Sequence, residues 1–305
     1  MYDMIVVGGG PAGMTAALYA LRNGRTVLVI EKQGFGGQIT HSPKVENYPG
    51  TLQMSGNEFA DRMLDQILAQ GAEIELETVV TVKPDNGFHT VRTEEGSTYE
   101  GRTVVLATGV RHRMLGLEGE NELVGDGISF CAVCDGDFYT GQKVCLAGGG
   151  NSALQEAILL SEKCREVVIL QDLPQLTGEM RLQEVLMAKP NVQVITGTKI
   201  TALKTQDGSL SGVEIESRRD GSRQVISCDG LFVAIGLIPE NEPFAFLASL
   251  NAYGYFDSDE SCLTKTPGIY VAGDCRSKTV RQLTTAAADG ATAALAACRY
   301  LSGQN

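Results

Sequence analysis

The sequence predicts an α/β protein of two three-layer domains, with the second domain inserted in the first. The main observation is a pattern that occurs twice: a short apolar run, a glycine-rich turn, a helix opened by small residues, and another apolar run. It covers residues 4–30, beginning "MIVVGGGPAGMTAALYA", and residues 143–172, beginning "KVCLAGGGNSALQEA". A strand, glycine turn, helix and strand in this order are typical of a Rossmann-like nucleotide-binding unit, so the repeat predicts two such domains.

The remaining segments alternate between apolar and turn-forming residues and complete these two units. "AEIELETVVTVK" and "FHTVRTEEGSTYEG" are interpreted as hairpin strands, and "QVITGTKITALKTQDGSLSGVEIESR" as a second meander. "RTVVLATGV" is interpreted as a buried strand that ends in a glycine turn, and "CDGLFVAIGLIP" as its counterpart that closes the second unit. "GIYVAGD" fits the final strand that the first unit lacks. We therefore expect a discontinuous first domain, residues 1–114 and 241–305, and an inserted domain, residues 115–240.

The composition of the chain excludes several classes of function. The chain has 305 residues and a net charge of −12, which argues against binding to nucleic acid or to an anionic membrane surface. No apolar run approaches the roughly 20 residues of a membrane-spanning helix, and "MYDMIVVGGG" lacks the basic segment of a signal peptide. The eight cysteines are scattered apart from one close pair. A cytoplasmic, reducing location is therefore expected.

The first glycine-rich turn has the spacing of a dinucleotide site. Gly8, Gly10 and Gly13 form G-x-G-x-x-G between a strand and a helix, where the backbone can approach a pyrophosphate at the helix N-terminus. Glu31 ends the next strand, where an acid can bind ribose hydroxyl groups. The motif alone is weak because glycine turns also occur in units without a ligand, but strand, helix and acid are all present here. Both FAD and NAD use this motif.

Two later strand ends favour FAD. "VVLATG" ends in Thr108 and Gly109, and "GIYVAGD" ends in Gly273 and Asp274. Together they would bring further glycine turns and an acid towards an extended dinucleotide. Each of them alone is only a buried strand that leaves a sheet.

The close cysteine pair, Cys131 and Cys134, has the spacing of a redox dithiol. A two-residue gap lets the pair close as a disulfide, so that one thiolate attacks and the other resolves. Half of a zinc site is the main alternative, but no second C-x-x-C is present and the three histidines lack ligand spacing, so no metal is expected. Inert core cysteines are a further alternative, although Asp135 and Asp137 follow them directly.

Several motifs in order along the chain resemble the low-molecular-weight thioredoxin reductase family. They are "GGGPAG", "GFGGQI", "VENYPG", "CAVCDG" and "VAGDC" followed by "VRQLTTAAADGATAA". The resemblance implies a homodimer in which electrons pass from a reduced pyridine nucleotide to FAD, then to the dithiol and then to a partner disulfide. It also implies that the inserted domain rotates, and that thioredoxin or a thioredoxin-like protein is the partner.

The resemblance also implies a role for each matching residue. Cys134 would face the flavin and form the charge-transfer thiolate, Cys131 would attack the substrate disulfide, and Asp135 would supply a proton. The positions that match FAD-binding residues come from both ends of the chain. They are Gly8, Gly10, Pro11, Ala12, Gly13, Glu31, Gly37, Gln38, Asn47, Thr108, Gly109, Gly273, Asp274, Arg281, Gln282 and Leu283.

The second glycine motif departs from the family pattern at the strand that follows it. The motif itself is kept in the segment Gly148, Gly150, Asn151, Ser152 and Ala153. Family members that use NADPH carry a basic H-R-R-x-x-x-R group for the 2′-phosphate, whereas this chain has Gln171, Asp172, Leu173 and Thr177 there. NADPH is therefore not expected. Asp172 can bind the 2′-hydroxyl of NADH, the pocket can hold a second FAD, or no dinucleotide binds and ferredoxin or another carrier supplies the electrons.

The surroundings of the dithiol leave the partner open. Asp126 stands where family members often have a basic residue that helps to dock thioredoxin, and Asp137 adds charge to a loop that is usually apolar. The leading hypothesis is a flavin-dependent disulfide reductase that acts on a thioredoxin-like protein. The alternatives are a similar enzyme with an unusual electron donor, and a flavin-binding redox sensor without turnover.

Overall fold

The chain forms two compact units. A computed structural model describes residues 1–42, 44–85 and 87–303. Residues 1–111 and 238–305 make unit 1, and residues 112–237 make unit 2. The chain passes between the units along β7 (Val110–His112) and β16 (Leu237–Pro239), which pair with each other. Each unit has a parallel sheet between a helical layer and an antiparallel layer, which confirms the predicted α/β fold class of a Rossmann-like unit inserted in another.

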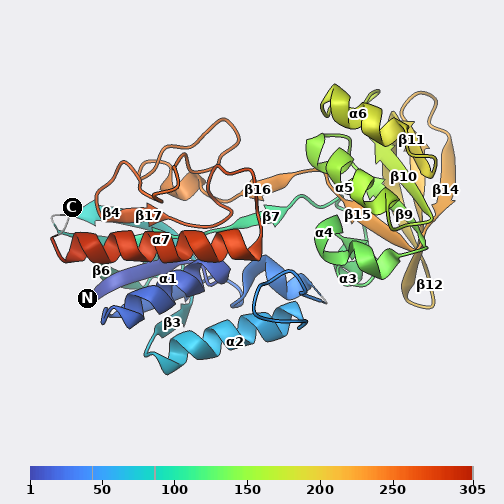
Figure 1. Ribbon diagram of the computed structural model, residues 1–305. Coiled ribbons are helices and arrows are strands. Elements are labelled where there is room, and N and C mark those ends of the chain that lie inside the picture. Colours follow the sequence, from blue (N-terminus) through green and yellow to red (C-terminus); the bar gives the residue numbers. More distant parts are fainter. Residues whose placement is uncertain (43, 86, 304–305) are drawn as a thin grey trace. The chain divides into compact units, whose positions relative to one another are not determined.

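The central sheet of unit 1 is parallel and comes from both ends of the chain (Figure 1). Its strands are β3 (Glu73–Leu76), β2 (Val27–Glu31), β1 (Tyr2–Val7), β6 (Thr98–Leu106) and β17 (Ile269–Val271). All of the β1 residues after Asp3 are buried, as expected for a strand covered on both faces. The pairing of β17 with β6 confirms that "GIYVAGD" supplies the last strand of this sheet.

Three helices cover one face of this sheet: α1 (Pro11–Arg22), α2 (Gly56–Ala69) and α7 (Leu283–Leu301). Helices α1 and α7 run side by side in Figure 1, and small residues let them approach closely. A Cβ atom on Gly290 would lie 2.1 Å from the carbonyl oxygen of Ala12, so a larger residue there would force the helices apart. The alanine-rich C-terminal helix therefore packs inside unit 1.

The opposite face carries an antiparallel layer. Strands β4 (Val79–Asp85) and β5 (Phe88–Thr93) continue from β6, and the short helix η3 (Glu242–Phe244) covers the neighbouring core. The predicted hairpin strands are confirmed for β4, β5 and β6, which pair antiparallel. The prediction is wrong for the first part of "AEIELETVVTVK", because β3 pairs in parallel with β2. Glu77 and Thr78 separate the two strands, and the alternation of apolar and polar residues is the same for parallel and antiparallel pairing at an exposed edge.

The central sheet of unit 2 is also parallel. Its order is β11 (Val192–Thr196), β10 (Glu166–Gln171), β9 (Lys143–Ala147), β15 (Gly230–Val233) and β8 (Ile128–Ser129). The predicted closing strand in "CDGLFVAIGLIP" is confirmed as β15, which lies beside β9. The predicted meander is partly wrong, because its first strand, β11, pairs in parallel with β10.

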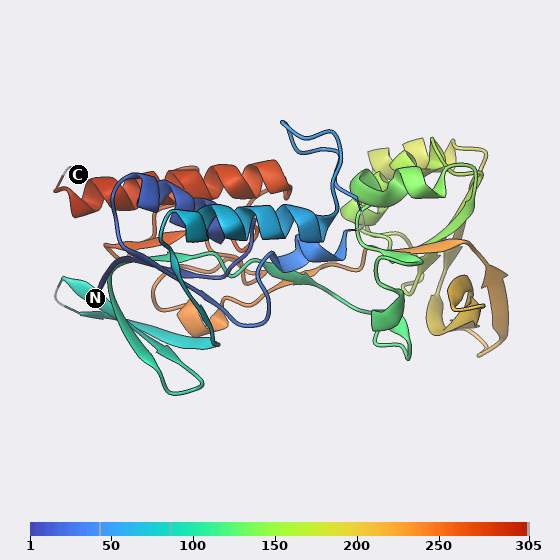
Figure 2. The same cartoon turned by 90° about the horizontal axis from the view of Figure 1, so that it is seen from below.

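Two further layers complete unit 2 (Figure 2). Helices lie on one side of the sheet, and a three-stranded antiparallel sheet lies on the other. The elements are α4 (Ala132–Asp135), α5 (Asn151–Ser161) and α6 (Met180–Met187) on the helical side, and β12 (Thr198–Gln206), β13 (Ser209–Ser217) and β14 (Arg223–Ser227) opposite. Unit 2 also contains the short elements α3 (Glu120–Leu123) and η2 (Gly136–Tyr139), and unit 1 contains the short helix η1 (Gly37–His41).

Candidate active site

The glycine turn of unit 1 has the geometry of a phosphate-binding loop. Gly8 has φ +108°, a conformation that L side chains rarely adopt, and a Cβ atom there would lie 2.3 Å from the carbonyl oxygen of Ala107. A Cβ atom on Gly13 would lie 1.9 Å from the carbonyl oxygen of Gly8. Only glycine fits at either position, because strand, turn and helix meet without space for a side chain.

Helix α1 begins directly after this turn and keeps its N-terminal N–H groups available. Gly10 is the N-cap residue, Pro11 occupies the first helical turn, and within the described residues no side chain caps the helix. The first turn contains no acidic residue. A twelve-residue helix with an uncapped N-terminus attracts an anionic group such as a pyrophosphate.

Glu31 lies at the end of β2 with its carboxylate fixed against the glycine turn. Its Oε2 accepts a hydrogen bond from the N–H of Gly9 at 2.7 Å, and its Oε1 accepts one from the N–H of Gln33 at 3.0 Å. Both donors are backbone groups, so the orientation of the carboxylate depends on the turn itself. The structure therefore brings the predicted ribose-binding acid to the predicted glycine loop.

The C-terminal segment of unit 1 supplies a second acid at the end of β17. Asp274 follows Gly273, and its Oδ1 is buried without a hydrogen-bond partner among the described residues. Burial raises the pKa of Asp274 to about 6. A buried oxygen without a partner is costly, which is consistent with a site where a ligand hydroxyl completes the hydrogen bonding.

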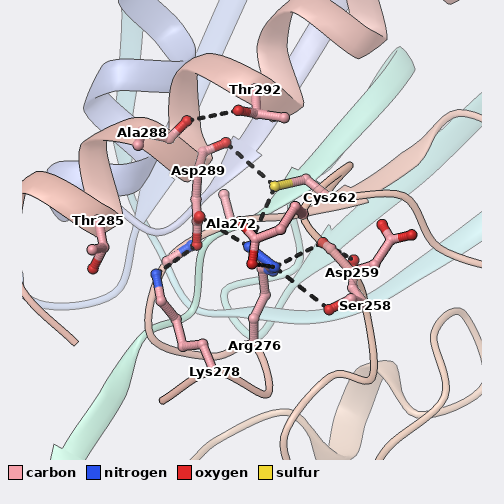
Figure 3. A network of polar contacts seen from close by, with 12 residues as sticks. Ser258, Asp259, Cys262, Ala272, Arg276, Lys278, Thr285, Ala288, Asp289 and Thr292 are labelled. Atoms are coloured by element: carbon pink, nitrogen blue, oxygen red, sulfur yellow. Dashed lines mark hydrogen bonds and ion pairs between the residues drawn. The ribbon is translucent and has the colours of Figure 1, made fainter. Parts of the chain in front are cut away.

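An ionic network of Asp289, Arg276 and Lys278 lies beside the end of β17 (Figure 3). Asp289 of α7 accepts hydrogen bonds from the N–H of Gly273 at 3.0 Å and from Lys278 Nζ at 2.9 Å, and it pairs with Arg276 Nη1 at 2.9 Å. Arg276 is 1% exposed, and its other terminal nitrogen donates to the carbonyl oxygen of Asp259 at 2.7 Å. The sequence analysis missed Arg276, in the turn after β17, and Asp289, in the alanine-rich helix, because a charged residue carries no local sign that it is buried.

Other predicted FAD-binding residues contact side chains from elsewhere in unit 1. Asn47 Nδ2 donates to Gln282 Oε1 at 3.2 Å, although the two residues lie far apart in the sequence. Thr108 Oγ1 donates to Oδ1 of the fully buried Asn241 at 2.8 Å, and Asn241 was also missed by the sequence analysis. Arg281 stacks 4.3 Å above the ring of Tyr255.

The remaining predicted positions of unit 1 lie on the same elements. Ala12 is buried in α1, and Gly109 has φ +65° after β6. Gly37 and Gln38 belong to η1, and Leu283 is the first residue of α7. Gln282 is the N-cap of α7 and forms a capping box with Thr285.

The dithiol lies in unit 2 at the short helix α4. Cys131 and Cys134 are joined by a disulfide bond, and the Sγ atom of Cys131 accepts a hydrogen bond from the N–H of Cys134 at 3.2 Å. Both cysteines are half-buried, and Val133 between them is 56% exposed. The pair is thus accessible at the surface of unit 2, as disulfide exchange with another protein requires.

Asp135 is buried behind the dithiol. Its Oδ2 accepts a hydrogen bond from Ser129 Oγ at 2.7 Å, and Ser129 Oγ in turn accepts one from the N–H of Cys131 at 3.1 Å. Its Oδ1 has no partner among the described residues. Burial raises the pKa of Asp135, and the hydrogen bond from Ser129 opposes this effect. A carboxyl that holds its proton to a higher pH is suited to protonate a thiolate.

The second glycine turn repeats the geometry of the first. Gly148 has φ +129°, and Gly150 is the N-cap of the eleven-residue helix α5. Asn151 in the first turn is engaged by Glu179, whose backbone N–H donates to Asn151 Oδ1 at 2.7 Å. Ser152 is exposed and Ala153 is buried. An acidic side chain, Glu179, thus lies at this helix N-terminus, which distinguishes it from α1.

The strand registers show which residue of unit 2 matches Glu31. The N–H of Gly8 bonds to the carbonyl oxygen of Ile30 at 2.8 Å, and the N–H of Gly148 bonds to that of Leu170 at 3.0 Å. The next residue is Glu31 in unit 1 and Gln171 in unit 2. The position that matches the predicted ribose-binding acid is therefore filled by a neutral amide, which is buried so close to Gly149 that a Cβ atom on Gly149 would lie 2.6 Å from it.

Asp172 has an ionic partner that the local sequence does not show. Arg218, at the end of β13, donates to both carboxylate oxygens of Asp172, at 2.5 and 2.8 Å. These hydrogen bonds lower the pKa of Asp172. From the sequence, this carboxylate was expected to bind a ribose hydroxyl. In the structure it is instead hydrogen-bonded to Arg218.

Two findings concern metals and membranes. In residues 1–42, 44–85 and 87–303, no three His, Cys, Asp or Glu side chains gather in a way that could hold a metal ion. Across the same part of the chain, every helix is too short or too polar to cross a membrane.

Comparisons with known proteins agree with this geometry. The family model described as pyridine nucleotide-disulphide oxidoreductase matches residues 2–290. A thioredoxin reductase of Listeria monocytogenes is 37% identical over 301 residues, which cover 99% of this chain and 94% of that protein. A Clostridium pasteurianum protein named "34.2 kDa protein in rubredoxin operon" is 35% identical over 303 residues, which cover 99% and 98%.

The solved structures show the same relationship. The crystal structure of the Streptococcus pyogenes thioredoxin reductase superposes with a TM-score of 0.93 at 36% identity and covers 99% of both chains. The Giardia duodenalis thioredoxin reductase superposes with a TM-score of 0.90 at 28% identity, again with 99% of both chains. The chain therefore belongs to the pyridine nucleotide-disulphide oxidoreductase family and, within it, to the low-molecular-weight thioredoxin reductases.

Proposed function

We propose that this protein is an FAD-dependent reductase that transfers electrons through Cys131 and Cys134 to the disulfide of thioredoxin or a thioredoxin-like protein. The observation that carries the proposal is the accessible Cys131–Cys134 disulfide backed by the buried carboxyl of Asp135. The relatives named above as thioredoxin reductases support the choice of partner.

The residues of unit 1 fit FAD. The N–H groups at the start of α1 would bind the pyrophosphate, Glu31 would bind the ribose, and the buried Asp274, with its unpartnered oxygen, would accept from a ligand hydroxyl. When bound, FAD supplies the electron pair that opens the disulfide. We assign the other predicted positions to the same site because they lie on the strand ends and helix starts around it.

The protein's own side chains perform the exchange chemistry. Once the disulfide is open, Cys131 attacks a sulfur of the partner disulfide, and a mixed disulfide forms as the partner's other sulfur leaves as a thiolate. Cys134 then attacks Cys131, which closes the original disulfide and releases the reduced partner. Asp135 donates a proton to a thiolate, because burial keeps its carboxyl protonated to a higher pH than usual.

The donor is proposed to be something other than NADPH. A 2′-phosphate needs fixed cationic partners, but Arg218, which reaches this strand end, is already bonded to both carboxylate oxygens of Asp172. The acid that would bind a 2′-hydroxyl is replaced by Gln171, which favours no particular dinucleotide. NADH, a second FAD in this pocket, and a carrier protein such as ferredoxin are the three donors to compare.

Anaerobic reduction of the purified protein tests these proposals. We expect a yellow protein that contains FAD, whose absorbance bleaches no faster with NADPH than with NADH. Rapid bleaching by NADPH would contradict the donor proposal alone. A colourless protein that takes up no FAD would contradict the function, and so would a dithionite-reduced flavin that leaves Cys131–Cys134 oxidised, because the protein would then act only as a redox sensor.

A carrier protein is tested by the same spectra. If neither nucleotide bleaches the flavin, reduced ferredoxin should do so and should support reduction of thioredoxin. Quantifying the FAD released per chain on denaturation separates one flavin from two. Two per chain would assign the second pocket to FAD, and one would exclude that donor.

A further inference from the structure

The hydroxyl group of Ser129 lies between the buried acid and the dithiol. Ser129 ends β8, and its side chain is buried in unit 2. Its Oγ donates a hydrogen bond to Oδ2 of Asp135 at 2.7 Å and accepts one from the N–H of Cys131 at 3.1 Å. Within the described residues, both hydrogen bonds of this hydroxyl therefore go to the dithiol motif.

The direction of these two bonds follows from a count of protons. A serine hydroxyl has one proton and two lone pairs, whereas a backbone N–H can only donate. The N–H of Cys131 therefore occupies a lone pair of Oγ, and the hydroxyl proton is left for Oδ2 of Asp135. A hydroxyl proton turned away from Oδ2 would be buried without an acceptor among the described residues, which is costly. Oδ2 thus accepts this bond in both protonation states of the carboxyl.

The same count places the proton of the acid on its other oxygen. Oδ1 of Asp135 is buried and has no hydrogen-bond partner among the described residues, so a proton bound there is not shared with a neighbour. When that proton leaves, the remaining charge is stabilised by the hydrogen bond from Ser129 to Oδ2. This agrees with the pKa of Asp135, which burial raises and the hydrogen bond from Ser129 lowers.

The ionisable side chains near Asp135 come from the elements packed around it. Helix α4 packs on α5 and η2, and β8 pairs with β15, which carries no ionisable side chain. The ionisable side chains on these elements and just before β8 are Asp126, Asp137, Tyr139 and Glu156. Asp126 is exposed, and Asp137 pairs with Lys163. Burial raises the pKa of Tyr139 to about 12, so its phenol is neutral. Burial also raises the pKa of Glu156, to about 7, so its titration has to be told apart from that of Asp135.

We propose that Ser129 is a positioning residue, which keeps the proton of Asp135 on Oδ1 and stabilises the carboxylate after that proton has been transferred. The inference rests on the function proposed above. In the exchange step, the Cys131 thiolate forms a bond to one sulfur of a substrate disulfide, and the S–S bond breaks with its electron pair on the other sulfur. That sulfur takes the proton from Oδ1 and leaves as a thiol. Asp135 is then a carboxylate held by Ser129, and it regains a proton from solvent.

The proposal predicts that Ser129 matters only when the leaving sulfur needs a proton. Alkyl thiolates resemble that of free cysteine, with a pKa of about 8.5, and bind a proton at neutral pH. The aromatic thiolate released by 5,5′-dithiobis(2-nitrobenzoic acid) is weakly basic and leaves without one. Ser129→Ala should therefore slow exchange with bis(2-hydroxyethyl) disulfide by about tenfold and leave exchange with the nitrobenzoate disulfide unchanged.

Stopped-flow kinetics of the full-length protein measure both reactions after anaerobic reduction of the dithiol with dithiothreitol and removal of the excess. Ser129→Thr keeps a hydroxyl group and should restore the rate with bis(2-hydroxyethyl) disulfide. Ser161→Ala is the matched control, because Ser161 is a buried serine of unit 2 whose hydroxyl donates to the carbonyl oxygen of Ile158 at 2.6 Å. It should leave both rates unchanged. Equal slowing of both reactions by Ser129→Ala would show a structural role and overturn the proposal, and so would two unchanged rates.

An infrared pH titration of the oxidised full-length protein tests the position of the proton. It needs no donor, partner or turnover, so failure of the proposed reductase activity would leave it unaffected. With the proton on Oδ1, the carbonyl oxygen of neutral Asp135 is Oδ2, and its C=O stretch should have the lowered frequency of a hydrogen-bonded carbonyl. The band should be absent from Asp135→Asn and present in Glu156→Gln, which assigns it. A free-carbonyl band in the wild type would overturn the proposal, even if Ser129→Ala does not fold.

The same spectra report the effect of Ser129 on the acid. In Ser129→Ala the band should move to the frequency of a free carbonyl. The midpoint of its titration should move to higher pH by about one pH unit, because a hydrogen bond to a charged group no longer stabilises the carboxylate. Ser161→Ala should keep the wild-type band and midpoint. An unchanged midpoint in Ser129→Ala, or an equal change in Ser161→Ala, would overturn the proposal.

Discussion

Replacing Asp274 with asparagine separates the contribution of this carboxyl to ligand binding from its contribution to stability. Asp274 is buried at the end of β17, and its Oδ1 has no partner among the described residues. Burial raises its pKa from 3.8 to about 6. Because the folded protein favours the protonated form, the carboxyl stabilises the flavin-free protein fully only below about pH 3.8, and this contribution is lost as the pH rises through 6.

The pKa shift sets the expected size of the effect. At pH 8 the carboxyl is ionised in both folded and unfolded chains, and a shift of about two pKa units corresponds to about 3 kcal/mol of lost stability. At pH 5 it is still largely protonated in the folded protein, and the loss is about half as large. Asparagine carries no charge, so flavin-free Asp274→Asn should exceed the wild type in unfolding free energy by about 3 kcal/mol at pH 8 and by about 1.5 kcal/mol at pH 5.

Urea unfolding of the flavin-free proteins, followed by circular dichroism at both pH values, measures this difference. Asp61→Asn, which removes an exposed carboxylate of α2, is the control and should show no difference between the two pH values. The holoprotein should show the opposite ranking, because Asp274→Asn weakens FAD binding, measured by flavin fluorescence on dilution. A flavin-free Asp274→Asn protein that is less stable than the wild type at pH 8 would refute the reasoning.

Three further predictions follow from the same geometry. Cys131→Ser should abolish reduction of thioredoxin, assayed with insulin precipitation, yet keep its FAD, and full turnover would disprove the exchange role. Asp289→Asn removes the buried carboxylate that pairs with Arg276 and should lower the unfolding free energy by about 3–5 kcal/mol in urea. Glu58→Gln, at an exposed ion pair, should cost less than about 1 kcal/mol, and equal losses in the two variants would contradict this. Asp135→Asn removes the buried acid and should lower kcat/KM for thioredoxin most strongly on the acidic side of the profile, where the wild-type carboxyl is protonated, and an unchanged pH profile would exclude it as the proton donor.

Much of the architecture followed from short-range patterns. The glycine turns at Gly8 and Gly148 have their positive φ values because strand, turn and helix are specified within a few residues. The dithiol spacing of Cys131 and Cys134 is also local, and the structure joins the two in a disulfide. The C-terminal strand β17 could be predicted because the first unit visibly lacked its last strand.

The pairing direction of edge strands was less predictable. Strands β3 and β11 were both interpreted as antiparallel, yet each lies parallel at the edge of a central sheet. Alternation of apolar and polar residues reports how a strand is buried and says little about the direction of its neighbour. The direction depends instead on the helix or loop that returns the chain to the sheet.

The sequence by itself determined the two nucleotide-type units, the glycine turns and the dithiol, because each is encoded by spacing within one supersecondary element. Only the tertiary structure decided which charges are paired. It brings Arg218 to Asp172, and Asp289 to Gly273. These contacts join residues from different elements, and such contacts arise from the packing of layers, which no local pattern of residues specifies.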